Sequence, residues 1–175
     1  MIYQKNSSTL NIAYWFYNKS KMLNKNFSEQ KLQYLLFLSQ MHYSVKYEKL
    51  LMPSLFVYSR SGIYDPSIRT IMDYGFPLMP QPQFDDEIKD FLNLIWQKYS
   101  SQSEAKLQEF IYSLKCFKHF YGEKNEIIIN PLNLVDSFSS SQTEKKSASS
   151  PKSKIMISQN GPVKVSTWAP RKLNQ

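Results

Sequence analysis

The chain has 175 residues, about the size of one ordinary domain, which excludes two large domains. A hydrophobic content of 42% and an aromatic content of 15% can fill a core, so wholesale disorder is excluded as well. The formal net charge of +8 is typical of proteins that bind nucleic acid or anionic membranes, so its position along the chain matters.

The positive charge is concentrated near the C-terminus. Residues 137–175 hold one acid and seven bases and carry +6, whereas the preceding 136 residues hold 15 bases against 13 acids and carry +2. The seven bases are Lys145, Lys146, Lys152, Lys154, Lys164, Arg171 and Lys172. We therefore predict a nearly neutral domain over residues 1–137 and a basic tail over residues 138–175.

Other global features act mainly as exclusions. A single cysteine, Cys116, excludes an intramolecular disulfide framework and a cysteine-only zinc site. The N-terminus turns polar at once, without the apolar core of a signal peptide, and no apolar run is long enough to span a membrane. We expect a cytoplasmic protein that does not enter a membrane.

Two helices are predicted before residue 50. Ser8 or Thr9 can cap a helix over Thr9–Met22, and Ser28 can cap a second helix from about Glu29 to Tyr47. The second helix carries an apolar stripe and widens it with further apolar residues, which predicts a central helix that contacts neighbours on two sides. The stripe consists of Leu32, Leu35, Leu36, Ser39 and Tyr43, and the residues expected to lie off it are Gln33, Gln40 and Lys46.

Residues 54–84 are predicted to contain a short strand, a turn, a helix and a loop. Ser54–Ser59 is rich in β-branched and aromatic residues and predicts a short strand, and Arg60–Gly62 predicts a turn. Asp65 can cap a helix over Pro66–Tyr74, since a proline at the first helical position loses only an amide without a partner. Gly75–Phe84 contains three prolines and is predicted to be a loop.

Two more helices are predicted after this loop. Asp85, Asp86 and Glu87 suit the positive end of the first helix, whose buried stripe is Ile88, Phe91, Leu92, Ile95, Trp96 and Tyr99. Ser101 and Glu104 have the spacing of a capping box for the second helix, which Gly122 would end. The stripe of the second helix is Leu107, Phe110, Ile111, Leu114 and Phe117.

The end of the domain and the tail have different characters. Glu126–Ile129 predicts a short strand, and Asn130 with Pro131 starts a brief helix that ends at Ser137. From Ser139 the serine- and lysine-rich sequence predicts disorder, except for two alternating runs within residues 154–168 that could form a short ordered hairpin. The predicted fold class is mainly α: one compact helical domain with at most two short strands, plus a basic and largely disordered tail.

Few residues could carry out chemistry. His42 and His119 are the only histidines, and Cys116 with His119 supplies two soft ligands rather than a metal site. The acids at residues 85–87 fit a helix start better than a calcium loop. No glycine-rich phosphate loop is present. We predict no catalytic, cofactor-binding or metal-binding residues, no cofactor, and no enzymatic activity.

One segment resembles a known family. Lys31-Leu32-Gln33-Tyr34-Leu35-Leu36-Phe37-Leu38-Ser39-Gln40 is similar to the Lys-Leu-Gln-Lys-Leu-Leu-Tyr-Phe-Ala-Gln helix of the Panacea domain, the family of SocA-like antitoxins and GepA-like phage-associated proteins. Leu50–Ile68 resembles the family's next stretch, with Gly62 at the turn and Pro66 before a short helix. The resemblance covers residues 8–137 in order.

The chain also departs from the family pattern. Phe56-Val57-Tyr58 replaces the family's acidic and tryptophan positions, Ile63 replaces the proline after the glycine, and Glu104–Phe120 lacks the later Thr-His and Trp positions. The resemblance therefore indicates a divergent member. It implies a helical domain that binds a partner protein, either a toxin that it neutralises or a protease to which it delivers the toxin. It carries no contact residue over, and Lys31 and Gln33 are expected on the helix exterior as scaffold.

The leading functional hypothesis is therefore a non-enzymatic, antitoxin-like protein-binding module. One alternative is a nucleic-acid-associated protein that uses the basic tail, since lysines and arginines can neutralise phosphates. Another is a phage or host structural or effector protein that has lost antitoxin activity, because the family residues named above are replaced.

Overall fold

The computed structural model describes residues 8–25, 27–114, 117 and 126–140, and two strands at residues 154–158 and 161–165. The chain divides into two compact units, Met1–Ser141 and Gln142–Gln175. The boundary predicted at residue 137 falls inside a helical segment, residues 135–140, that belongs to the first unit.

The first unit is mainly helical, which confirms the predicted fold class. Each of the first three N-caps makes the expected side-chain bond to a backbone amide: Ser8 accepts from Asn11, Ser28 from Lys31, and Asp65 from Ser67 and Ile68. These caps start the helices where the sequence predicts them. The helices are α1 (Thr9–Met22), α2 (Glu29–Tyr47), α3 (Pro66–Tyr74), α4 (Asp86–Tyr99) and α5 (Glu104–Tyr112).

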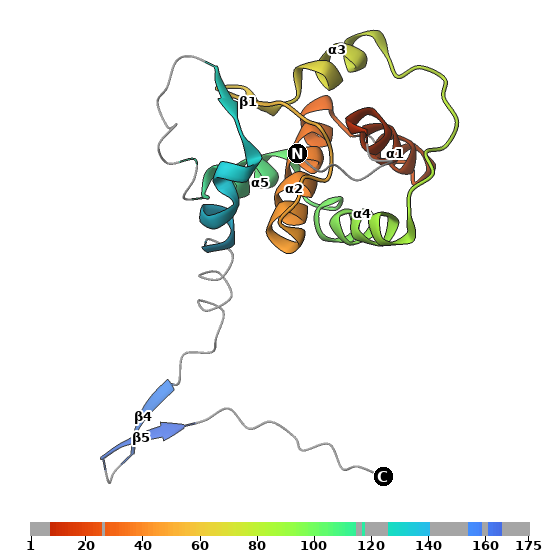
Figure 1. Cartoon of the computed structure of the whole chain (residues 1–175). Coiled ribbons are helices and arrows are strands. Elements are labelled where there is room, and N and C mark those ends of the chain that lie inside the picture. Colours follow the sequence, from red (N-terminus) through yellow and green to blue (C-terminus); the bar gives the residue numbers. More distant parts are fainter. Residues whose placement is uncertain are drawn as a thin grey trace, which may run out of the picture. The chain divides into compact units, whose positions relative to one another are not determined.

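Helix α2 is the centre of the unit, as its wide apolar face predicts. It contacts α1 and α4 as well as α5 and the strand that follows the first hairpin turn (Figure 1). Between Leu32 and Ser44 only His42 falls short of full burial. A helix enclosed on every side has no solvent face, so its polar side chains can be satisfied only inside the protein, and among the described residues only the buried Tyr34 hydroxyl lacks such a partner.

Two glutamines of α2 correct the sequence-based expectation that they lie outside the buried stripe. Gln33 and Gln40 are both 0% exposed. The Gln33 carboxamide accepts from the Asp65 amide at 2.8 Å and donates to the Asp65 carbonyl at 3.4 Å. The Gln40 carboxamide oxygen accepts from the Met52 amide at 3.2 Å. Both residues therefore hold the chain that follows α2 against the helix.

A small antiparallel sheet lies beside α2 and has one strand more than predicted. Its strands are β1 (Phe56–Ser59), β2 (Gly62–Tyr64) and β3 (Ile127–Ile129), in the order β2-β1-β3. Tyr58 pairs with Ile63 on one side and with Ile127 on the other. Strand β2 escapes prediction because three residues are too few to show a period of two, and its first residue belongs to the predicted turn.

The capping box predicted at Ser101 is wrong. The N-cap of α5 is Ser103, whose hydroxyl accepts from the Lys106 amide at 3.3 Å. Ser101 instead lies in the turn that ends α4, where the Gln102 amide donates to the Tyr99 carbonyl. Helix α5 ends at Tyr112, earlier than the predicted stripe, and Gly122 lies outside the described residues.

The first unit closes with a short helical segment. Asn130 caps the 3-10 helix η2 (Pro131–Leu134), as the Asn-Pro pair predicts, and residues 135–140 continue as α-helix beyond the predicted end. In the second unit β4 (Lys154–Ser158) pairs antiparallel with β5 (Gly161–Val165). The predicted disorder of the remaining tail falls on residues that the structure does not describe.

Candidate functional site

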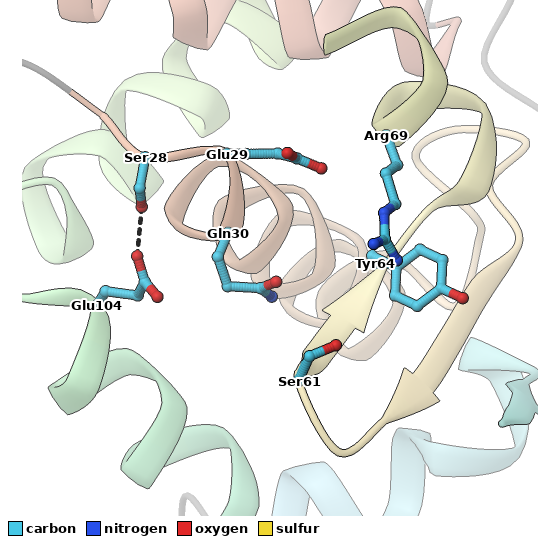
Figure 2. Close-up of a pocket in the computed structure, with 7 residues that line it drawn as sticks. All are labelled: Ser28, Glu29, Gln30, Ser61, Tyr64, Arg69 and Glu104. Atoms are coloured by element: carbon cyan, nitrogen blue, oxygen red, sulfur yellow. Dashed lines mark hydrogen bonds between the residues drawn. The ribbon is translucent and has the colours of Figure 1, made fainter. Parts of the chain in front are cut away.

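A polar hollow of about 330 Å³ opens where α2, α5 and the β1–β2 turn meet (Figure 2). Glu104 borders one side and Arg69 with Tyr64 borders the other, while the Glu29 side chain extends from α2 toward Arg69. The start of α2 lies between the first turn of α5 and the sheet, and helix α3 adds Arg69 as the fourth contributing element. The lining residues are Ser28, Glu29, Gln30, Ser61, Tyr64, Arg69 and Glu104.

Ser28 and Glu104 form a hydrogen bond that connects two helices. The Ser28 hydroxyl donates to the Glu104 carboxylate, which ties the start of α2 to the start of α5. The same hydroxyl accepts from the Lys31 amide at 3.1 Å, so it is engaged as a helix cap. A hydroxyl held in this way is not a free nucleophile, and the pair carries no sign of acyl-transfer chemistry.

The opposite side of the hollow is formed by a stacked arginine and tyrosine. The Arg69 guanidinium lies 4.9 Å from the centre of the Tyr64 ring, a cation–π distance. The Tyr64 hydroxyl donates to Glu126 at 2.7 Å, and this hydrogen bond raises the pKa of Tyr64. The guanidinium thus borders the hollow beside the ring of Tyr64 (Figure 2).

The floor of the hollow depends on the absence of a side chain at Gly62. The Gln30 carboxamide donates to the Ile63 carbonyl at 2.9 Å and passes directly over Gly62. A Cβ at residue 62 would meet three atoms of that carboxamide within 3.0 Å. The φ of Gly62, +142°, is also one that other residues rarely adopt.

We expect Gly62→Ala to lower the free energy of unfolding by about 2–3 kcal/mol, because the Gln30 carboxamide must move aside and lose its hydrogen bond to Ile63 in addition to the backbone strain. Gly75→Ala is the matched control: its φ is +86°, but nothing lies within 4 Å of the added Cβ. The control should lose only about 1–2 kcal/mol in denaturant unfolding, the strain alone. Equal losses in the two variants would contradict the role assigned to Gln30.

The polar hollow carries charges of both signs. Glu29 and Glu104 can bind a lysine or arginine side chain of a partner, and Arg69 can bind a carboxylate. Three of the hollow's seven lining side chains already cap a helix or stack on one another: Ser28, Tyr64 and Arg69. It therefore offers a small set of charged contacts to a partner surface.

A second hollow, of about 270 Å³, lies between the end of α1 and the middle of α4. Its rim is apolar and open, since Met22 is 79% exposed and Leu23 is 52% exposed. We call it the α1–α4 hollow. Its lining residues are Trp15, Lys19, Met22, Leu23, Gln81, Lys89 and Asn93.

The floor of the α1–α4 hollow is cationic. The Lys19 ammonium donates to the Asn93 carboxamide oxygen and lies 4.4 Å from the centre of the Trp15 ring. Burial lowers the pKa of Lys19. Lys89 adds a second, exposed ammonium group on α4. An apolar rim over two cations fits a partner side chain that is apolar and has an acidic neighbour.

The histidines do not lie in either hollow. His42 Nε2 lies 2.6 Å from the Tyr99 hydroxyl and 3.5 Å from the Lys98 ammonium. An ammonium group can only donate, so a hydrogen bond from Lys98 requires the tautomer in which Nε2 accepts and Nδ1 carries the proton. Burial, followed by Lys98, lowers the pKa of His42 to about 3. His119 and Cys116 lie outside the described residues.

Lys31 and Gln33 behave as scaffold, although Gln33 is not on the helix exterior. The Lys31 ammonium donates to the Ser100 carbonyl at 2.9 Å and lies 4.4 Å from the centre of the Phe27 ring. Burial lowers the pKa of Lys31.

The sequence analysis predicted neither hollow, because each is built from segments that only the fold brings together. The one available signal was a pair of apolar residues, Met22 and Leu23, at the end of a predicted helix, and both are exposed in the structure.

In the part of the chain that the structure describes, no three His, Cys, Asp or Glu side chains gather closely enough to hold a metal ion. Of the helices described there, none combines the length and apolarity that crossing a bilayer requires. Comparisons with family models, with curated proteins and with solved structures found no match to this chain.

Proposed function

We propose that the chain is a non-enzymatic, cytoplasmic protein-binding module that resembles the toxin-neutralising antitoxins, or the proteolytic adaptors, of the Panacea family. The observation that carries this proposal is the α1–α4 hollow, where Met22 and Leu23 stand exposed around a concave surface with a cationic floor. Exposed apolar side chains at a rimmed concavity are typical of protein interfaces.

The roles of the motif glutamines support the resemblance at the level of the fold. Gln33 and Gln40 each use a buried carboxamide to hold the backbone that follows α2. Any protein in which the backbone after this helix follows the same path would need a hydrogen-bonding side chain at the positions of Gln33 and Gln40. The Lys31–Gln40 motif therefore supports a common core, while the contact surface is left to residues outside it.

Co-expression with the products of the flanking reading frames tests the proposal. We expect one product to be toxic alone, to be neutralised by the chain, and to co-purify with it. Met22→Ser with Leu23→Ser should weaken this complex at least about tenfold, because each apolar side chain buried in an interface contributes about 1–3 kcal/mol. The measurements are survival of the co-expressing cells and a titration of the purified partner.

Leu55→Ser is the matched control, since Leu55 is an apolar side chain of similar exposure that does not line the α1–α4 hollow. It should leave neutralisation and affinity unchanged. The proposal fails if no flanking product is toxic and none co-purifies. The assignment of the hollow fails if the Met22 and Leu23 variant binds as tightly as the Leu55 variant.

The charge of residues 137–175 favours a second candidate, a nucleic-acid-associated protein. Seven bases against one acid give this segment +6. Binding of this kind releases counterions and weakens steeply with salt. Salt-dependent binding that disappears when the seven bases are replaced by glutamine would favour this candidate over the antitoxin-like one.

A further inference from the structure

The connection between α3 and α4 is an exposed apolar segment with no helix or strand. It runs along the outside of the domain past α1 (Figure 1). Pro77, Pro80 and Pro82 lie in it, and Leu78 has no solvent protection at all, with a relative exposure of 104%. A single exposed leucine is common on protein surfaces and carries no argument by itself, but its exposure shows that Leu78 does not contribute to the core.

Over residues 76–82 of this connection burial repeats every third residue, and the period ends there because Phe84 is half-buried. Phe76, Met79 and Pro82 are half-buried, whereas the two residues after Phe76 and the two after Met79 are exposed. A polyproline II helix has three residues per turn, so this period places one face on the domain and turns the other two to solvent. We call residues 76–82 the proline segment.

The sequence favours the same conformation. Each proline has its φ held near the polyproline II value. The residue before each proline is biased toward the same region, which applies to Phe76, Met79 and Gln81. Local restrictions therefore act on all residues of the proline segment except Leu78.

The proline segment is also anchored to α1. The Phe76 ring packs against the rings of Tyr14 and Tyr17, at centroid distances of 5.8 Å and 4.6 Å. The Asn18 side chain donates to the Gln81 carboxamide oxygen at 3.3 Å. A segment held at both ends loses little conformational freedom when a partner binds it, which favours binding.

We propose that the proline segment is a preformed ligand for a partner domain whose groove is lined by aromatic rings, with Pro77, Leu78 and Pro80 as the inserted side chains. Grooves of this kind recognise the polyproline II helix through alternating proline and apolar positions. The three inserted side chains do not line the α1–α4 hollow, although Gln81 of the same segment does, so the two proposals use neighbouring surfaces with different contact residues.

Charge specifies the partner further. Residues 70–88 contain four acids and no base, and the acids Asp73, Asp85, Asp86 and Glu87 flank the proline segment on both sides and are exposed. A groove rimmed by lysine and arginine would match this distribution, whereas an acidic rim would oppose it.

The test titrates the full chain against a panel of purified SH3, WW and EVH1 domains that includes basic-rimmed and acidic-rimmed grooves. We expect saturable binding to basic-rimmed members that weakens as salt increases. Pro77→Ala with Pro80→Ala should weaken it at least about tenfold. Gln83→Ala, an exposed position just past the proline segment, is the matched control and should bind like the unmodified chain.

Both variants should unfold at the same denaturant concentration as the unmodified chain, because the replaced side chains are exposed. The proposal is overturned if every panel domain binds more weakly than about 1 mM, the range of unspecific contacts. It is also overturned if the double proline variant binds like the Gln83 variant. A preference for acidic-rimmed grooves would overturn the charge assignment. If any of these outcomes occurs and the double proline variant still neutralises a toxin, only the proposal for the proline segment is overturned, and the antitoxin-like role is still supported.

Discussion

Replacing Leu35 by alanine is expected to lower the free energy of unfolding by about 2–5 kcal/mol. Leu35 is 0% exposed and sits on α2, which packs against helices on one side and the sheet on the other. The walls of the resulting cavity belong to several elements, so they cannot all collapse inward to fill it. Denaturant unfolding followed by circular dichroism measures the loss.

Leu94→Ala is the matched control for this experiment. It removes the same atoms from a helix, but Leu94 is 59% exposed on α4. We expect a change within about 0.5 kcal/mol. A loss below about 1 kcal/mol for Leu35→Ala would mean that α2 is not the centre of the core.

Acidification is expected to destabilise the protein through His42. The pKa of this imidazole is lowered to about 3 by burial and by Lys98, whereas in the unfolded chain it is close to the ordinary histidine pKa of 6.5. Between pH 6.5 and pH 3 the unfolded chain binds a proton that the folded chain excludes. This part of the stability is therefore complete above pH 6.5 and is lost as the pH falls, by roughly 1.4 kcal/mol per pH unit.

The comparison with His42→Gln isolates this effect. Glutamine keeps a polar partner for the Tyr99 hydroxyl but has no titrating ring. Between pH 7 and pH 4 the unmodified chain should lose about 3 kcal/mol more than the variant in denaturant unfolding. Burial raises the pKa of Asp65, so Asp65 affects the pH dependence of stability with the opposite sign. Asp65 and His119 are present in both proteins, so their contributions cancel in the comparison. Parallel pH profiles would contradict the prediction.

The helices were predictable because their signals are local. Ser8, Ser28 and Asp65 cap amides two or three residues away, and the buried stripe of α4 follows from spacing alone. The error at Ser101 is instructive. A serine three residues before a glutamate satisfies the capping pattern, but the turn that ends α4 occupies that position and leaves the cap to Ser103.

The candidate sites were much less predictable. The polar hollow joins Ser28 to Glu104 across 76 residues of sequence, and the α1–α4 hollow joins Lys19 to Asn93 across 74. No local pattern relates residues at such separations. The proline segment is intermediate: its loop character follows from its prolines, but its period of exposure depends on the ring of Phe76 resting on α1.

The amino-acid sequence was sufficient to establish a mainly α domain, its helix starts and the separation of its charge into +2 and +6. Capping, periodicity and charge depend only on residues within a few positions of one another. Only the tertiary structure determined which polar residues of α2 are buried and which groups they hydrogen-bond. Gln40 and His42 are neighbours on one helix, yet one is satisfied by Met52, 12 residues away, and the other by Tyr99, 57 residues away. Whether a polar side chain can be buried depends on which distant groups fold against it, because its desolvation must be offset by a hydrogen bond there.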